Sequence, residues 1–189
     1  MMRIIRGRVY VAFWAAFMAC AGVSATTLMH MSVARMTDAA DVVIHAQCVG
    51  SATGWDAGEI WTFTSFQTVE VWKGAAAAHI TVRLLGGRAG NLASSVPGVP
   101  RFQPGEEVVL FLQATGRGDY SIVSWVQGTF RIRRDSRSGK KSAAQDTADF
   151  PTFDPATRQF VASGVRGVPI DVLRAQVDAA LHNRAGRAQ

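Results

Sequence analysis

Hydrophobic and polar residues alternate with a period of two between Asp41 and Arg133, and clusters of turn residues interrupt the pattern. This period places successive side chains on opposite faces of a β-strand, so it predicts strands with one buried face. Thr, Val, Ile, Phe and Trp dominate the runs and suit a pleated, half-buried surface. We expect five strands, over residues 41–49, 60–73, 79–85, 106–112 and 120–133, with a loop over residues 51–58.

The second of these strands mixes polar and apolar residues on both faces, which a flat strand does not explain. A bulge or bend near residues 65–68 reconciles its two halves, as happens where a sheet curls on itself. Five antiparallel strands with a curled second strand predict a mainly β fold, specifically a small five-stranded antiparallel OB-like barrel within residues 26–133.

A long segment without strand or helix pattern, residues 86–103, interrupts the strands. Such segments in compact domains tend to be functional, and an aromatic residue on one is a common anchor for a partner. The plainer alternatives are that Phe102 belongs to the core and that Gly86–Gly90 is a strand-ending loop with glycines at positive φ. The candidate partner-binding residues are Arg88, Asn91, Val99, Arg101 and Phe102.

The pattern changes after the fifth strand. Residues 134–142 contain no apolar side chain, and we interpret residues 134–149 as a flexible, basic and polar hairpin tip or linker. In the C-terminal segment, residues 150–189, apolar residues recur at helical spacing and Pro169 suits the first helical position. This predicts a helix over about residues 169–182 that packs on the barrel through Ile170, Leu173, Val177 and Leu181. One or two further helical turns are expected within residues 32–40.

The N-terminus has the pattern of an export signal. Three Arg precede an apolar run from Val9 to Val23, and small residues follow, so cleavage after Ala25 is predicted. A membrane anchor is the alternative, but the apolar run is shorter than the ~20 residues that span a bilayer. A lipoprotein attached through Cys20 is also less favoured, because Phe17 and Met18 depart from the usual acylation motif. We expect a periplasmic or secreted protein with no transmembrane segment after cleavage.

Composition narrows the class of protein. The chain has 189 residues, is 48% hydrophobic and carries a formal charge of +6, which excludes a collagen, a disordered polymer and a disulfide scaffold. Loss of residues 1–25 removes three Arg and no acid, so the charge falls to +3. A net charge this small argues against a nucleic-acid partner. Cys48 then remains alone, and its place on a predicted strand favours a buried thiol.

The order of strands and turns resembles a family of uncharacterised exported bacterial proteins. The resemblance covers about residues 28–133 and rests on the segments Ala40-Asp41-Val42-Val43, Lys73-Gly74, Gly98-Val99-Pro100, Val109-Leu110-Phe111-Leu112 and Gln127-Gly128-Thr129-Phe130. Members of that family are often encoded beside matrixin-type metalloproteases. The resemblance therefore implies an exported protein as partner, with a secreted protease as the best single candidate.

The same pattern resembles the netrin-like, OB-type barrel of the tissue inhibitors of metalloproteinases. Those inhibitors bind the protease zinc through an N-terminal cysteine and depend on several disulfides, whereas the predicted start here is Thr26-Thr27 and one cysteine remains. The resemblance extends to the fold and to a possible protease partner, but not to the inhibitory mechanism.

No residue pattern indicates catalysis, a metal or a cofactor. The sequence has no Gly-x-Ser-x-Gly elbow, and its His residues are scattered, with His45 expected to face outward from the first strand. Glu106 and Glu107 are adjacent on a strand and point to opposite faces, so they cannot chelate together. We predict no catalytic residues, no metal site and no cofactor, and a hydrolase with an unrecognised site is the least favoured class.

Basic residues cluster between Arg131 and Lys141. They suit weak contact with an anionic envelope surface, although a solvated hairpin tip explains them better, because no aromatic residues are interleaved with them. The candidate electrostatic residues are Arg134, Arg137, Lys140 and Lys141. The sequence therefore favours an exported, non-enzymatic protein-binding module, and the alternative is an envelope-associated structural protein attached through this basic hairpin.

Overall fold

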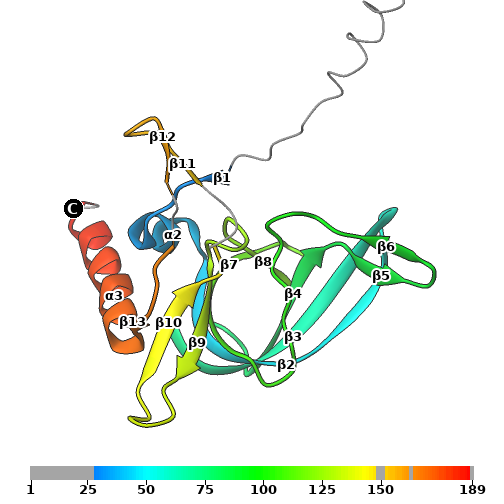
Figure 1. The fold of residues 1–189 in the computed structure, drawn as a ribbon, viewed down its shortest axis with the longest axis horizontal. Coiled ribbons are helices and arrows are strands. Elements are labelled where there is room, and N and C mark those ends of the chain that lie inside the picture. Colours follow the sequence, from blue (N-terminus) through cyan, green and yellow to red (C-terminus); the bar gives the residue numbers. More distant parts are fainter. Residues whose placement is uncertain (1–27, 148–151, 162–163, 188–189) are drawn as a thin grey trace, which may run out of the picture.

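The computed structural model describes residues 28–147, 152–161 and 164–187, and the predicted leader lies outside them. The described chain is mainly β, with two helices on one side (Figure 1). Its largest sheet has the strand order β13-β10-β9-β7-β2-β3-β4-β8, and β8 also pairs with β7. Five strands therefore close a ring: β2 (Val42–Asp56), β3 (Glu59–Lys73), β4 (His79–Leu85), β7 (Glu107–Ala114) and β8 (Tyr120–Ile122).

The expectation of a purely antiparallel sheet is wrong. Four joints of the ring are antiparallel, but β4 and β8 pair in parallel. The reason is geometric: strand direction cannot alternate around a ring with an odd number of strands, so one joint has to join two strands of the same direction. The parallel joint is also the shortest, with one register pair, Val82↔Tyr120.

The hairpin of β2 and β3 is longer than predicted. Pairing continues to Asp56↔Glu59, and Ala57 and Gly58 form the turn at φ 50° and 83°, so the predicted loop over residues 51–58 is wrong. The expected irregularity is confirmed by register shifts at Val43/Ile44, His45/Ala46 and Cys48/Gly50, which lie opposite Phe66 to Lys73 on β3. Bulges of this kind bend a strand and let the sheet curl.

The predicted fifth strand is two strands. β8 ends at Ile122, and a turn with Ser124 and Trp125 both at φ 50° leads to β9 (Thr129–Arg134). β9 pairs with β7 and also with β10 (Lys141–Gln145), so of the two interpretations of residues 134–149, hairpin tip or linker, the hairpin describes the residues up to Gln145. β13 (Val168–Pro169) completes this extension of the sheet outside the ring.

The ring surrounds an apolar interior that is filled by side chains of its own strands and by Phe102 from the connection between β6 and β7. The fully or nearly buried side chains there are Val42, Ile44, Ala46, Cys48, Phe66, Ile80, Val82, Leu84, Phe102, Val108, Leu110, Leu112 and Ile122. Burial raises the pKa of the Cys48 thiol, and the charge of Glu106 adds to the effect. Cys48 therefore behaves as the small hydrophobic residue that the sequence favoured.

A second apolar layer lies outside the ring, under α2 (Val33–Ala39) and α3 (Ile170–Arg187). Ser32 caps α2 by accepting the Arg35 backbone N–H at 3.3 Å. The predicted C-terminal helix is confirmed but extends five residues further, and Leu173 and Val177 are its buried stripe. In the described part of the chain, no helix is long and apolar enough to cross a membrane.

The first described residues are tied to the ring by one glutamine. The buried Gln127 side chain accepts the Met31 N–H and donates to the Met29 carbonyl, both at 2.8 Å. β1 (Leu28–Met29) pairs in parallel with β11 (Thr152–Asp154), which pairs with β12 (Gln159–Val161). The chain that follows the predicted cleavage site is therefore fixed to the fold within a few residues.

Candidate binding site at the open seam of the ring

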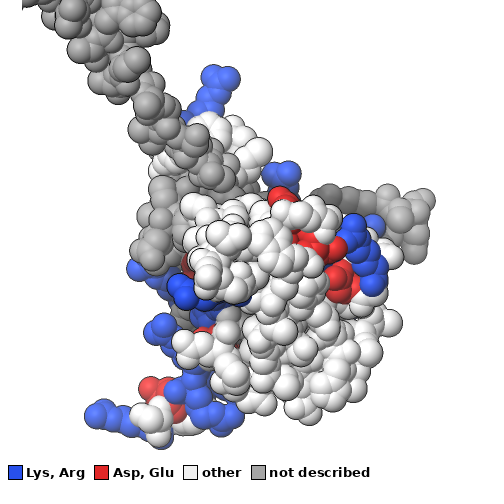
Figure 2. Space-filling view, turned by 90° about the vertical axis from the view of Figure 1, so that its right-hand side faces the viewer, with Lys and Arg blue, Asp and Glu red and all other residues white. Residues whose placement is uncertain are grey.

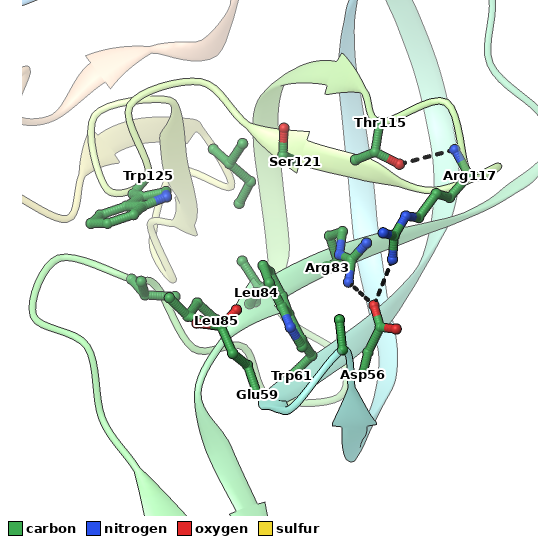
Figure 3. Close-up of a pocket in the computed structure, with 13 residues that line it drawn as sticks. Asp56, Glu59, Trp61, Arg83, Leu84, Leu85, Thr115, Arg117, Ser121 and Trp125 are labelled. Atoms are coloured by element: carbon green, nitrogen blue, oxygen red, sulfur yellow. Dashed lines mark hydrogen bonds and ion pairs between the residues drawn. The ribbon is translucent and has the colours of Figure 1, made fainter.

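The parallel joint opens into a pocket. Beyond Val82↔Tyr120, no strand among the described residues pairs with the outer edge of β4 from Arg83 to Leu85. A pocket of about 440 Å³ lies there, between β4 and β8 (Figure 3). We call this place the seam; its lining residues include Asp56, Glu59, Trp61, Arg83, Leu84, Leu85, Val99, Thr115, Arg117, Ser121, Ile122 and Trp125.

Arg83 forms the charged wall of the seam. It stands opposite Phe63 in the β3–β4 ladder, so its side chain lies on the outer face of the ring. Its guanidinium carbon is 4.1 Å from the ring centre of Trp61 and 5.8 Å from that of Phe63, and the side chain is 9% exposed. Contact with two aromatic faces stabilises a cation that has lost most of its water. Arg83 is therefore a fixed positive charge.

Asp56 and Arg117 complete the charged end. Arg83 and Arg117 both donate to the same Oδ2 atom of Asp56, Arg117 through Nη1 at 2.8 Å. The hydrogen bond from Arg83, together with the charges of both guanidiniums, holds the pKa of Asp56 below its ordinary value. Asp56 ends β2, whereas Arg117 lies in the β7–β8 turn and is 60% exposed. Three segments, the end of β2, β4 and the β7–β8 turn, thus meet at one carboxylate oxygen (Figure 3).

The opposite end of the pocket is apolar. Figure 3 places Trp125 far from Arg117, with Leu84, Leu85 and Trp61 between them. The backbone of Trp125 is anchored in the left-handed turn: its N–H donates to the Ile122 carbonyl at 3.3 Å, and its carbonyl accepts the Thr129 hydroxyl at 3.1 Å. The seam is therefore elongated, with charges at one end and an indole at the other.

The predicted partner-binding residues lie in different parts of the structure. Val99 lines the pocket, and Arg101 donates to the Leu85 carbonyl at 3.0 Å, at the end of β4. Arg88 and Asn91 are exposed on the hairpin of β5 (Gly87–Ala89) and β6 (Leu92–Ser94), so residues 86–103 are not without strands.

The prediction that Phe102 anchors a partner is wrong, because Phe102 is 8% exposed and belongs to the interior. Its ring packs edge-on against Phe66, with centroids 5.0 Å apart, and the guanidinium of Arg131 covers it at 5.4 Å. The plainer interpretation, a core residue at the end of a long connection, describes its place.

The predicted basic cluster divides into paired and unpaired residues. Lys141 binds Glu107, and Arg131 binds Glu106 at 2.7 Å and Asp146 at 2.8 Å. The exposed members at the β9–β10 turn have no ion pair with any described residue: Arg133, Arg134, Arg137 and Lys140. Figure 2 shows Lys and Arg gathered at its lower end, where this hairpin lies, while uncharged side chains cover most of the face in view.

His45 faces outward from the ring, as expected, but it is buried beside Trp72 of the outer layer. Its Nε2 lies 2.6 Å from Glu107 Oε1, which also binds Lys141. Burial works against ionisation of Glu107, but the bonds from Lys141 and His45 outweigh it and lower the pKa of Glu107. The described residues contain no group of three or more His, Cys, Asp or Glu placed to hold a metal ion.

Sequence reasoning missed most of the seam. Its charged end consists of Asp56, Arg83 and Arg117, its other end is Trp125, and Trp61 lies between them. Trp61 and Trp125 fall within predicted strands, and Asp56 and Arg117 are separated by 61 positions in the sequence with no motif that joins them. Set against models of protein families and against curated protein sequences, the chain has no match in either, so its resemblance to the exported bacterial family stays a prediction.

Proposed function

We propose that the ring is a small OB-like barrel and that the chain is an exported, non-enzymatic module that binds an extended segment of another protein at the seam. The observation that carries the proposal is the edge of β4 from Arg83 to Leu85, which no described strand covers and where the Arg101 side chain holds the Leu85 carbonyl, beside a pocket lined by Trp61 and Trp125. Curling of β2 and β3 through bulges, around a filled apolar interior, supports the barrel.

An unpaired strand edge offers backbone N–H and carbonyl groups to an incoming extended peptide. Main-chain hydrogen bonds supply affinity in this mode, and pockets for alternate side chains supply specificity. Trp61 and Trp125 fit the second role, since half-buried aromatic residues are the commonest anchors of protein interfaces. Asp56 stays ionised because of its two guanidinium partners, which suits charge pairing better than proton transfer.

The partner class that the resemblance suggests is a secreted metalloprotease. Association of the purified chain with such a protease, measured by calorimetry at micromolar concentration, is the direct test. Binding that is lost when Ser121 becomes Trp supports the seam as its site, and the absence of association overturns this choice of partner.

The seam itself is tested without assuming a partner. Random twelve-residue peptides displayed on phage are selected on the chain exported by a bacterial host, and the bound peptides are titrated against Ser121→Trp, which fills the pocket. We expect at least a tenfold loss of affinity, whereas Ser136→Trp, on the exposed β9–β10 turn, changes nothing. No enrichment of peptides, or equal binding to both variants, contradicts the proposal.

The alternative of an envelope-associated protein is favoured by one observation, the exposed and unpaired cations of the β9–β10 turn. Asp135 fixes this turn by accepting the N–H groups of Arg137 at 3.0 Å and Ser138 at 2.7 Å. A fixed basic turn can lie on an anionic bilayer, with about 1 kcal/mol from each cation near the surface. Sedimentation with phosphatidylglycerol vesicles in low and high salt tests it, with Arg137→Gln/Lys140→Gln as the variant and Arg88→Gln/Arg166→Gln as the control.

A further inference from the structure

We propose that the segment bound at the seam carries a carboxylate that docks between Arg83 and Arg117, with an apolar side chain two positions away in contact with Trp125 and Leu85. This inference rests on the proposed function and specifies its ligand. The seam would then select an acidic–x–apolar pattern, in either chain direction.

The first argument is an excess of hydrogen-bond donors. Each guanidinium has five N–H groups, yet Arg83 and Arg117 direct one nitrogen each at a single oxygen of Asp56. The Nε of Arg83 is buried and has no hydrogen-bond partner among the described residues. A buried donor without a partner is costly, and a bound carboxylate would satisfy it.

Asp119 does not fill this role. Its Oδ2 atom is 3.9 Å from Arg83 Nε, which is too long for a hydrogen bond. Its Oδ1 atom accepts the Thr115 hydroxyl, and this contact ties it to the β7–β8 turn. Asp119 thus contributes a long-range ion pair to Arg83 but no hydrogen bond, and the cavity beside Arg83 and Arg117 stays open to a further carboxylate.

The two arginines are suited to a shared anion in different ways. Arg83 is held against Trp61 and Phe63, so its position costs little further ordering when a ligand binds. Arg117 is 60% exposed, so its guanidinium can close on the ligand from the rim. Guanidinium groups bind carboxylates through paired N–H donors, which makes such contacts stronger and more directional than those of Lys.

The spacing of the pattern follows from the register of β4. Arg83 and Leu85 are two residues apart, so both side chains lie on the outer face, opposite Phe63 and Trp61. A strand added along this edge places its own outward side chains beside Arg83 and beside Leu85, about 7 Å apart. Figure 3 shows Glu59 at the Leu85 end, where it disfavours an acid, so the carboxylate belongs at the Arg83 end.

The test uses fluorescein-labelled peptides and fluorescence anisotropy. The parent is Thr-Thr-Glu-Thr-Leu-Thr amide, and Gln or Lys replaces its Glu in two matched peptides. A fourth, Thr-Leu-Thr-Gln with a free terminal carboxylate, and its amide ask whether a chain end supplies the anion. We expect the Glu peptide to bind wild type about tenfold more tightly than the Gln peptide, and the Lys peptide to bind most weakly.

Arg117→Gln is the deciding variant, because Arg117 is exposed and its loss leaves the fold intact, whereas replacement of Arg83 removes a buried cation. In Arg117→Gln the Glu and Gln peptides should bind equally, and in the control Arg88→Gln the tenfold preference should persist. Equal binding of both peptides to wild type, tighter binding of the Lys peptide, or a preference that survives Arg117→Gln overturns the inference. If binding without this preference is still blocked by Ser121→Trp, the proposed function stands alone; if no peptide binds wild type at 1 mM, both fall.

Discussion

Among the five strand pairings of the ring, the joint between β2 and β3 is the most extensive and the joint between β4 and β8 is the shortest. β2 pairs with β3 from Val43 to Asp56 and with β7 along its other edge, so its first half is bonded on both sides. β4 meets β8 at one register pair and then diverges. The first joint holds the ring together, and the second leaves strand edge and side chains accessible.

This difference follows from strand number and not from weak sequence at the seam. With five strands one joint is parallel, and here the two parallel strands are β8, three residues long, and β4, which pairs with it only at Val82 in its middle. The residues around the opening are well buried or well paired: Leu84 is 3% exposed and Arg83 is fixed between aromatic rings and Asp56. The side chains that line the seam are thus held in place before a ligand binds, as a binding site requires.

The largest effect on stability should come from the joint between β2 and β3, where the ring is fully paired. Phe66→Ala deletes a fully buried ring on β3 and leaves a cavity beside Phe102, so we expect the free energy of unfolding in urea to fall by about 3–5 kcal/mol. Leu85→Ala, at the half-buried seam, should cost about 1 kcal/mol or less. Ser65→Ala, exposed on the same strand as Phe66, is the control. A loss of unfolding free energy in Leu85→Ala as large as in Phe66→Ala would show that the seam contributes to stability as much as the buried core does.

The parts of the fold that could be predicted are those that leave a periodic pattern of hydrophobic residues in the sequence. Alternation marked the strands of the ring and helical spacing marked α3, because both patterns are local. The extension of β2 to Asp56 was missed because the turn depends on Ala57, a non-glycine at positive φ. The break between β8 and β9 was missed for the same reason at Ser124 and Trp125. In each case tertiary context fixes a backbone conformation that the residue type does not indicate.

Amide hydrogen exchange should show the second largest difference. The β2 amides from Ile44 to Ala46 lie between two paired strands, whereas those from Arg83 to Leu85 lie at an edge with one neighbour. We expect local opening at the seam to be about 2 kcal/mol easier, or roughly 30-fold faster exchange, measured by NMR or mass spectrometry. Addition of the Glu peptide should slow exchange at Arg83–Leu85 alone. Uniform protection of both strands would contradict an open joint.

The candidate site was less predictable than the fold. Val99 was chosen from a long connection and does line the pocket, but Phe102 from the same reasoning is in the core. The charged end is assembled from the end of β2, the middle of β4 and the β7–β8 turn, and such a convergence exists only after the ring closes. Sequence spacing carries no signal of it.

The effect of pH on the stabilisation by Glu107 should be smaller than the two effects above. The pKa of Glu107 is lowered in the folded chain, so its contribution to stability is present above its ordinary value of 4.5 and is lost as the pH falls through the folded value. Glu107→Gln should therefore destabilise by about 1–2 kcal/mol at pH 7 and much less at pH 3.5, measured by urea unfolding. Glu59→Gln, at the exposed hairpin end by the seam, is the control and should change little at either pH. An equal loss at both pH values would mean that Glu107 acts through packing and not through its charge to Lys141 and His45.

The smallest effect should come from the turn that ends the β2–β3 hairpin, where the closed joint reaches the rim of the seam. Ala57 has φ 50° and Gly58 has φ 83°, the pair of left-handed residues that a two-residue hairpin of this type requires. Asn tolerates that backbone better than Ala, so Ala57→Asn should stabilise the chain by about 0.5–1 kcal/mol in thermal unfolding. Ala52→Asn, on an exposed part of β2 with ordinary strand geometry, should give no gain. Ala57 also lines the pocket, so a loss of stability in Ala57→Asn would mean that the larger side chain clashes at the rim of the seam and that packing there outweighs the backbone preference of the turn.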